Sequence, residues 1–240
     1  MLTYRALITG LALVPASLLP AGRAADDKDS DARQYTSTFA VDEAELSPTG
    51  RNPYFILEPG YQLHYEGRDD GEAATLTITV LDKTLKVGNV VTRVVEERET
   101  VGGKLVEVSR NYFAVCKRTN NVYYFGEDVD MYKNGKVVSH DGTWLSGRDG
   151  AKFGLAMPGS PLPGARYYQE VAPKTAMDRA EVLSLSESLK TPAGDFMNCL
   201  KIEETTPLEP GDKAAKLYAR GVGLLKDGPV TLVRYGVVKK

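Results

Sequence analysis

Ser139, His140 and Asp141 come nearest to a known catalytic set, because a serine hydrolase uses these three residue types. They are consecutive, however, and neighbouring residues of a strand point to opposite faces, so they cannot form one proton relay. The chain also lacks the Gly-x-Ser-x-Gly turn that exposes the nucleophile of many hydrolases. We therefore assign no catalytic residue from this pattern.

Metal ligands are scarce. The two histidines, His64 and His140, lie far apart, and no His-Glu-x-x-His or paired-cysteine spacing occurs. A site that uses both histidines and a carboxylate stays open, although single histidines on strands usually have surface or structural roles. The acidic run Glu127-Asp128-Val129-Asp130 does not fit a calcium loop, because Lys133 stands where that loop needs glycine. We interpret it as a solvated strand end and predict no metal and no cofactor.

Two carboxylates could still catalyse glycoside hydrolysis, since such residues can meet from anywhere in a sequence. Glu170 and Asp178 lie near the proline-rich part of the chain and are the first candidates. With 32 acidic residues, however, chance supplies many such pairs. An unrecognised carboxylate hydrolase is therefore the third choice of function, behind two that are not enzymatic.

Aromatic residues remain as candidate ligand contacts. Tyrosine combines an apolar ring with a polar hydroxyl and suits a half-wet groove, although strands also favour it for ordinary packing. The candidate ligand-binding residues are Tyr65, Tyr112, Tyr124, Trp144, Met157, Tyr167 and Tyr218. The Gly- and Pro-rich segment 147–164 is predicted to be a long loop, which would form the rim of such a groove.

Strands must position these residues. Leu76, Ile78 and Val80 alternate with threonines, which is the period-two pattern of a strand with one buried face. Asn134-Gly135 predicts a two-residue hairpin turn, and similar turn signals recur along the chain. We therefore predict an all-β protein with little helix. About ten antiparallel strands would form a curved meander that closes into a barrel or half-barrel.

The first 24 residues indicate export. Arg5 precedes the apolar run Ala6 to Leu19, and Gly22-Arg23-Ala24 places small residues where a signal peptidase reads them. We predict a signal peptide over 1–24, a flexible acidic leader over 25–50 and a single β domain over 51–240. The destination would be the periplasm or the extracellular medium.

Composition limits the partners. The chain has a net charge of −2, and acidic and basic residues are mixed along it. Nucleic acids and anionic membranes attract basic patches, so we expect neither as a partner. No second long apolar run follows the signal, and we predict no membrane span after its removal. A lipid or another apolar small molecule stays a candidate partner, and no feature identifies a protein partner.

The two cysteines, Cys116 and Cys199, allow only one pairing. Export would place them in a compartment where disulfides persist. The alternative is that they are two small buried residues that never meet. The sequence slightly favours the bridge and leaves the alternative open.

Several segments carry a resemblance to a known group of proteins. They are Thr191 to Lys201, Leu217 to Lys226, Tyr124 to Asp128, Trp144 to Pro158 and Glu204 to Gly211. The chain resembles an uncharacterised family of exported bacterial β domains, whose C-terminal signature is similar to that of periplasmic half-barrels of the lipoprotein-carrier type. Relatives often carry a cysteine near Thr92, which weakens an inherited disulfide to Cys199. The resemblance implies a curved sheet and, by association only, an apolar ligand.

These patterns together predict an exported, non-enzymatic β domain that binds an apolar or amphipathic ligand on a concave sheet face. The alternative is an interaction scaffold with a filled core and no small-molecule ligand. A cavity lined by tyrosine, tryptophan and methionine would favour binding, and a solid interior would favour the scaffold.

Overall fold

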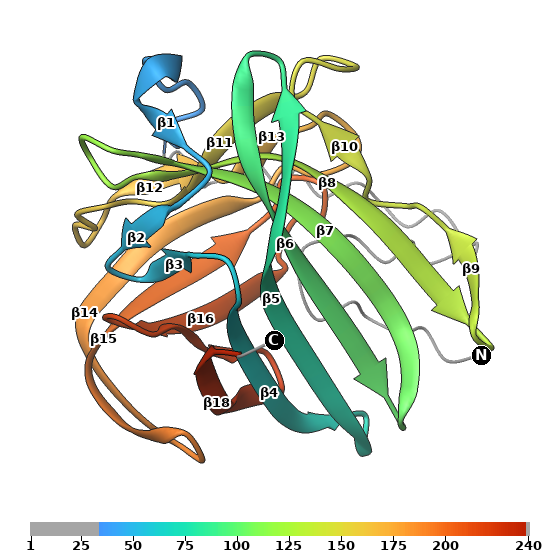
Figure 1. The fold of residues 1–240 in the computed structure, drawn as a ribbon. Coiled ribbons are helices and arrows are strands. Elements are labelled where there is room, and N and C mark those ends of the chain that lie inside the picture. Colours follow the sequence, from blue (N-terminus) through green and yellow to red (C-terminus); the bar gives the residue numbers. More distant parts are fainter. Residues whose placement is uncertain (1–33, 239–240) are drawn as a thin grey trace, which may run out of the picture.

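The computed structural model describes residues 34–238, which form almost nothing but β-structure (Figure 1). One 3-10 turn, Glu43–Glu45, is the single helical element of this part of the chain. The long strands are β4 (Tyr61–Asp69), β5 (Glu72–Val87), β6 (Val90–Val101), β7 (Lys104–Cys116), β8 (Val122–Lys133), β14 (Arg179–Thr191), β15 (Gly194–Thr205), β16 (Lys213–Ala219) and β18 (Val230–Val237). The shorter strands are β1 (Leu46–Ser47), β2 (Gly50–Asn52), β3 (Phe55–Leu57), β9 (Lys136–Ser139), β10 (Trp144–Leu145), β11 (Lys152–Met157), β12 (Arg166–Tyr168), β13 (Glu170–Val171) and β17 (Gly223–Asp227).

Thirteen strands follow one another around a single antiparallel sheet, in the order β12-β14-β15-β16-β17-β18-β4-β5-β6-β7-β8-β11-β13. Most neighbours are also neighbours in sequence, as a meander requires. The pairing of β18 with β4 joins the C-terminal part of the sheet to its N-terminal part. The sheet curls until it nearly closes into a barrel, with the β5–β8 wall opposite the β14–β16 wall (Figure 1). The predicted all-β barrel is confirmed, with more strands than the ten expected.

One seam of the barrel is not closed by strand pairing. The two edge strands, β12 and β13, are consecutive parts of one segment, Arg166–Val171. β12 pairs with β14, and β13 pairs with β11. Gly154 of β11 lies so close to this segment that a Cβ atom there would be 2.3 Å from the carbonyl oxygen of Gln169. The chain therefore crosses from one sheet edge to the other at Gln169.

The walls alternate inward and outward residues, as a half-buried strand should. In β5, Leu76 and Val80 are buried, and Ile78 on the same face borders the interior cavity described below. The register places Ile78 opposite Leu63 on one side and Glu97 on the other. Apolar and acidic side chains thus share the inner face of the barrel.

Two boundary predictions are wrong. Segment 147–164 is not one long loop, because it contains β11, which pairs with β8 and β13. Its three prolines begin at Pro158, so every residue of β11 keeps the amide N–H that pairing needs. The leader also ends earlier than residue 50, since Leu46 and Ser47 already pair with β7.

The predicted signal peptide, 1–24, and residues 25–33 of the predicted leader lie outside the described residues. Between residues 34 and 238, no helix has the length and apolar character that crossing a membrane requires.

Candidate functional site

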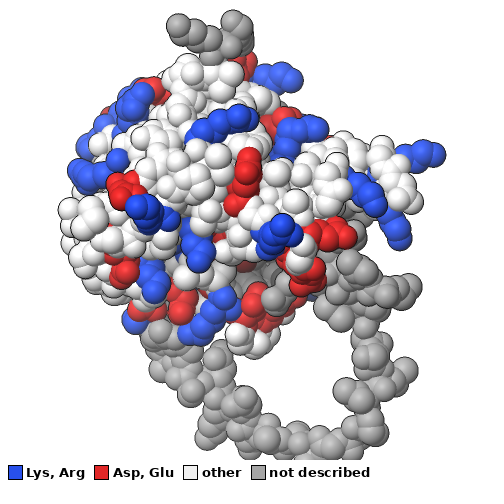
Figure 2. Space-filling view, turned by 90° about the horizontal axis from the view of Figure 1, so that it is seen from below, with Lys and Arg blue, Asp and Glu red and all other residues white. Residues whose placement is uncertain are grey.

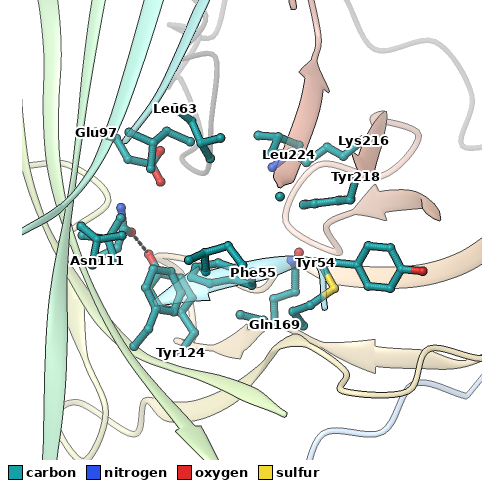
Figure 3. A pocket seen from close by; sticks show the side chains of 18 of the residues that line it. Tyr54, Phe55, Leu63, Glu97, Asn111, Tyr124, Gln169, Lys216, Tyr218 and Leu224 are labelled. Atoms are coloured by element: carbon teal, nitrogen blue, oxygen red, sulfur yellow. Dashed lines mark hydrogen bonds between the residues drawn. The ribbon is translucent and has the colours of Figure 1, made fainter. Parts of the chain in front are cut away.

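The barrel encloses a cavity of about 110 Å³ that is partly open (Figure 3). Nearly every wall contributes to it, and so does the short hairpin formed by β2 and β3. The lining residues are Tyr54, Phe55, Ile56, Tyr61, Leu63, Ile78, Val80, Val95, Glu97, Asn111, Phe113, Tyr124, Ala156, Met157, Gln169, Glu170, Glu204, Lys216, Tyr218, Gly223 and Leu224. Most of this surface is apolar, and three of the four charged or ionisable Glu and Lys side chains on it are acidic.

The β2–β3 hairpin is fixed between two sides of the barrel. The side-chain amide of Asn52 donates hydrogen bonds to the carbonyl oxygens of Asn120 (2.8 Å) and Pro158 (3.0 Å). On the other side, the amide N–H of Gly221 donates to the carbonyl oxygen of Pro53 at 2.7 Å. Asn52 is almost completely buried, so water cannot reach its side-chain amide, and these bonds supply the partners that the amide needs. The hairpin is therefore anchored where its residues border the cavity.

Aromatic rings form one side of the cavity. Phe113 stacks on Tyr124 with ring centres 4.7 Å apart, and Phe55 of the hairpin meets Phe113 edge to face at 4.9 Å. The hydroxyl of Tyr124 donates a hydrogen bond to Oδ1 of Asn111 (Figure 3). Behind Tyr124, Trp144 packs edge to face at 5.1 Å. The rings are fixed by one another before any ligand enters.

A buried ion-pair cluster occupies the wall formed by β15 to β17. The ammonium of Lys216 lies 2.7 Å from Glu204 and 3.5 Å from Asp227, and all three side chains are at most 10% exposed. Burial opposes the charge of Lys216, but Asp227 and Glu204 outweigh this effect and raise its pKa well above the usual value. Burial raises the pKa of Asp227 to about 6, against the opposing effect of Lys216. This wall holds its acids by pairing them with a cation.

The opposite wall, β6 to β8, also carries acids on its inner face, but within the described part of the chain no lysine or arginine lies at ion-pair distance from Glu97 or Glu107. The register places Glu97 opposite Ser109, and Glu99 opposite Glu107. Burial raises the pKa of Glu97 to about 7. Burial and the charge of Glu97 raise the pKa of Glu107 to about 8. The carboxyl group of Glu97 points into the cavity, toward the side that carries Lys216 and Tyr218 (Figure 3).

The seam adds two further polar groups to the cavity. Nε2 of Gln169 donates to Oε1 of Glu204 at 3.0 Å, which leaves Oε1 of Gln169 buried without a hydrogen-bond partner. The amide N–H of Asp178 donates to Oε1 of Glu170 at 2.6 Å, and Oε2 of Glu170 is buried without a partner. Burial, followed by the charge of Asp178, raises the pKa of Glu170 well above its usual range. Burial also raises the pKa of Asp178 to about 6.

The interior differs from the outer surface. On the face drawn in Figure 2, acidic and basic side chains are interspersed. On the cavity wall, three carboxylic acids face one lysine: Glu97, Glu170 and Glu204 against Lys216. Acidic side chains thus outnumber basic ones on the cavity wall.

The predicted ligand contacts are divided between the cavity and the surrounding core. Tyr124, Met157 and Tyr218 line the cavity, and Trp144 lies one layer behind it. The hydroxyl of Tyr65 donates to the carbonyl oxygen of Leu224 at 2.9 Å, deep in the core. The two remaining tyrosines lie away from the cavity lining: Tyr112 bonds to Asp128, and Tyr167 is buried in β12.

The structure also locates the candidate carboxylate pair and the two candidate metal-binding histidines. Glu170 and Asp178, the proposed carboxylate pair, do lie together. The two histidines do not lie together: His64 of β4 bonds to Thr77 of β5, and His140 bonds to the carbonyl oxygen of Val129. Over residues 34–238, no group of three or more His, Cys, Asp or Glu side chains is arranged to hold a metal ion.

The acidic run lies within β8 and not at its end, and the predicted solvation holds only in part, because Asp128 is exposed and Glu127 is not. Glu127 is buried, with only 1% of its surface exposed, and its pKa is raised well above the usual value, chiefly by burial. Asp128 accepts a hydrogen bond from Tyr112, and Asp130 pairs with Arg110 at 3.0 Å. The run lies inside β8 and supports the barrel wall.

The predicted disulfide is not formed. Cys116 and Cys199 are buried free thiols in β7 and β15. These strands are not neighbours in the sheet, and several strands separate them in either direction around the barrel. A disulfide requires Cβ atoms about 4 Å apart, which strands on different walls do not provide.

Sequence reasoning missed the acids of the cavity, apart from Glu170. A signal was present, because Val95, Glu97, Glu99 and Val101 alternate on one face of a strand. Valines at both ends of such a face indicate that the glutamates between them point the same way, toward the core.

Comparison with protein-family models, with curated proteins and with solved structures found no match for this chain.

Proposed function

We propose that this protein is a binding module that takes a small apolar or amphipathic molecule into the barrel cavity. The observation that carries the proposal is a preformed cavity lined by fixed aromatic rings and a few polar groups. Such a surface is typical of small-molecule sites, in which apolar walls supply affinity and a few polar atoms set orientation. A scaffold domain with a filled core would not need it.

The size of the cavity limits the ligand. A volume of about 110 Å³ is below the roughly 300–1,000 Å³ of drug-sized sites. It is closer to the roughly 150 Å³ of an engineered cavity that binds benzene. The cavity therefore suits a molecule, or one end of a molecule, about as large as a single aromatic ring. A lipid would place only part of itself inside.

Filling the cavity tests this function. Ala156 lines the cavity, so Ala156→Leu should occupy part of it and weaken binding of benzyl alcohol at least tenfold, measured by isothermal titration calorimetry. Overpacking costs roughly 1–3 kcal/mol, so thermal unfolding should verify that the variant is folded. Ala215→Leu, at an exposed position of β16, is the matched control and should bind as the wild type does.

Two outcomes would count against the proposal. Wild-type protein that binds no single-ring compound would favour the scaffold alternative. Unchanged binding by a folded Ala156→Leu variant would place the ligand elsewhere on the molecule.

A further inference from the structure

We propose that the cavity selects a small organic ammonium ion, with Glu97 and Glu170 as its counter-ions. This inference rests on the proposed function and specifies the chemistry of its ligand. The ligand would carry an amine protonated at neutral pH next to an apolar group about as large as one ring.

The first argument comes from hydrogen bonding. Among the described residues that line the cavity, three buried side-chain atoms have no hydrogen-bond partner: Oε2 of Glu97, Oε1 of Gln169 and Oε2 of Glu170. All three are oxygen atoms of carboxyl or amide groups. Buried polar atoms normally have partners, so these oxygens indicate a missing donor. An ammonium group donates up to three hydrogen bonds and accepts none, which matches this set.

Several of the protein's own donors at the cavity are already engaged. Lys216 is the one Lys or Arg among the described lining residues, and it pairs with Glu204 and Asp227. The hydroxyl of Tyr61 donates to the carbonyl oxygen of Val222 at 2.8 Å, and that of Tyr124 donates to Asn111. None of these three donors can serve Glu97 or Glu170 without losing its present contact. A donor that arrives with a ligand requires no such loss.

The aromatic side of the cavity supports the same class of ligand. Phe55, Phe113 and Tyr124 are fixed in mutual contact, and all three line the cavity. A cation that approaches the face of such a ring is attracted by the electrons of the ring. An anionic ligand would instead meet both the ring faces and the acidic groups unfavourably. The aromatic and acidic parts of the wall thus favour a cation with an apolar body.

Protonation explains how the empty cavity tolerates its acids. Burial raises the pKa of both Glu97 and Glu170, which favours the protonated, uncharged form of each carboxyl group over an uncompensated negative charge. An entering ammonium ion favours the ionised carboxylate, and the carboxyl proton then leaves to solvent. Binding should therefore release protons, which calorimetry in buffers of different ionisation enthalpy detects.

Three single-ring probes test the selectivity of the wild-type protein: benzylamine, benzyl alcohol and benzoate. At pH 7.5 we expect benzylamine to bind at least tenfold more tightly than benzyl alcohol, and benzoate to bind more weakly than either. If the alcohol binds as tightly as the amine, the ammonium inference is wrong while the proposed function stands. If none of the probes binds, the proposed function itself fails.

Variants test the assigned residues. Glu97→Gln and Glu170→Gln should each weaken benzylamine binding at least tenfold and change benzyl alcohol binding less than threefold. Glu66→Gln removes a carboxyl group whose side chain is 59% exposed, and it should leave both affinities unchanged. The ratio of the two affinities within one variant is insensitive to partial loss of folded protein. A ratio that stays at the wild-type value in both cavity variants would overturn the assignment.

Discussion

Two walls of the barrel bury carboxylic acids, and they neutralise them in different ways. On β15 to β17, Glu204 and Asp227 share the ammonium of Lys216. On β6 and β7, Glu97 and Glu107 have no lysine or arginine within ion-pair distance among residues 34–238, and burial raises the pKa of each into the range from about 7 to about 8. The first wall compensates its acids with a cation, and on the second wall burial favours the protonated form of the acids.

The difference separates a structural role from a binding role. Removing one partner of a buried ion pair leaves an uncompensated charge, so the paired wall is costly to change. A carboxyl group that holds a proton can release it when a cation arrives, so the protonated wall is ready to respond to a ligand. Under the proposed function, carboxylic acids thus stabilise one side of the cavity and would confer selectivity on the other.

Substituting the buried lysine should have the largest effect. Lys216→Met leaves Glu204 and Asp227 without their cation and should lower the free energy of unfolding by roughly 3–5 kcal/mol, measured by urea denaturation at pH 7.5. The matched control is Lys213→Met, because Lys213 pairs with Glu203 at 3.1 Å with half of its side chain exposed. Loss of that exposed pair should cost at most about 1 kcal/mol. Equal effects of the two substitutions would contradict the distinction between the walls.

The walls themselves were predictable because their signals are local. Alternation at Leu76, Ile78 and Val80 and the turn at Asn134-Gly135 need only neighbouring residues to be read. The seam was not predictable in this way. Its existence depends on β12 and β13, two parts of one segment, pairing with different strands, and β11 formed within a segment whose glycines and prolines suggested a loop.

The cavity was predicted only in part, and its acids show why. Glutamate is usually exposed, so residue type argued for placing Glu97 and Glu127 at the surface. Their burial follows from the shared inner face of three strands, which is a property of the register and not of any one segment. Tyr124, Met157 and Tyr218 were named because aromatic and methionine side chains suit grooves, and this reasoning cannot separate lining residues from the core behind them.

The protonated wall should make stability depend on pH. The ordinary pKa of a glutamate is 4.5, and the folded protein raises that of Glu107 to about 8. The folded state therefore binds more protons than the unfolded state across this range, so stability is fully present below pH 4.5 and falls as the pH rises toward 8. Glu107→Gln should flatten this fall and raise the free energy of unfolding at pH 8 by roughly 1–3 kcal/mol, at about 1.4 kcal/mol per pKa unit. Urea denaturation from pH 5 to pH 8 measures the slope, and Glu66→Gln should keep the wild-type slope.

The smallest expected effect connects the protonated wall to ligand binding. If an ammonium ion requires ionised Glu97, its affinity should rise up to tenfold per pH unit and should rise less steeply above about pH 7, where Glu97 has lost its proton. Burial is the main cause of the raised pKa of Glu97. The charge of Lys216 lowers this pKa and those of Asp227 and Glu204 raise it, so the measurement uses protein in which these three residues are unchanged. Calorimetric titration of benzylamine from pH 5.5 to pH 8 should show this dependence, and benzyl alcohol should bind equally across the range. Glu97→Gln should reduce the slope of the benzylamine profile near pH 7, and the slope that remains would belong to Glu170, the second proposed counter-ion. A profile that keeps the wild-type slope in this variant would show that the proton comes from another group of the cavity.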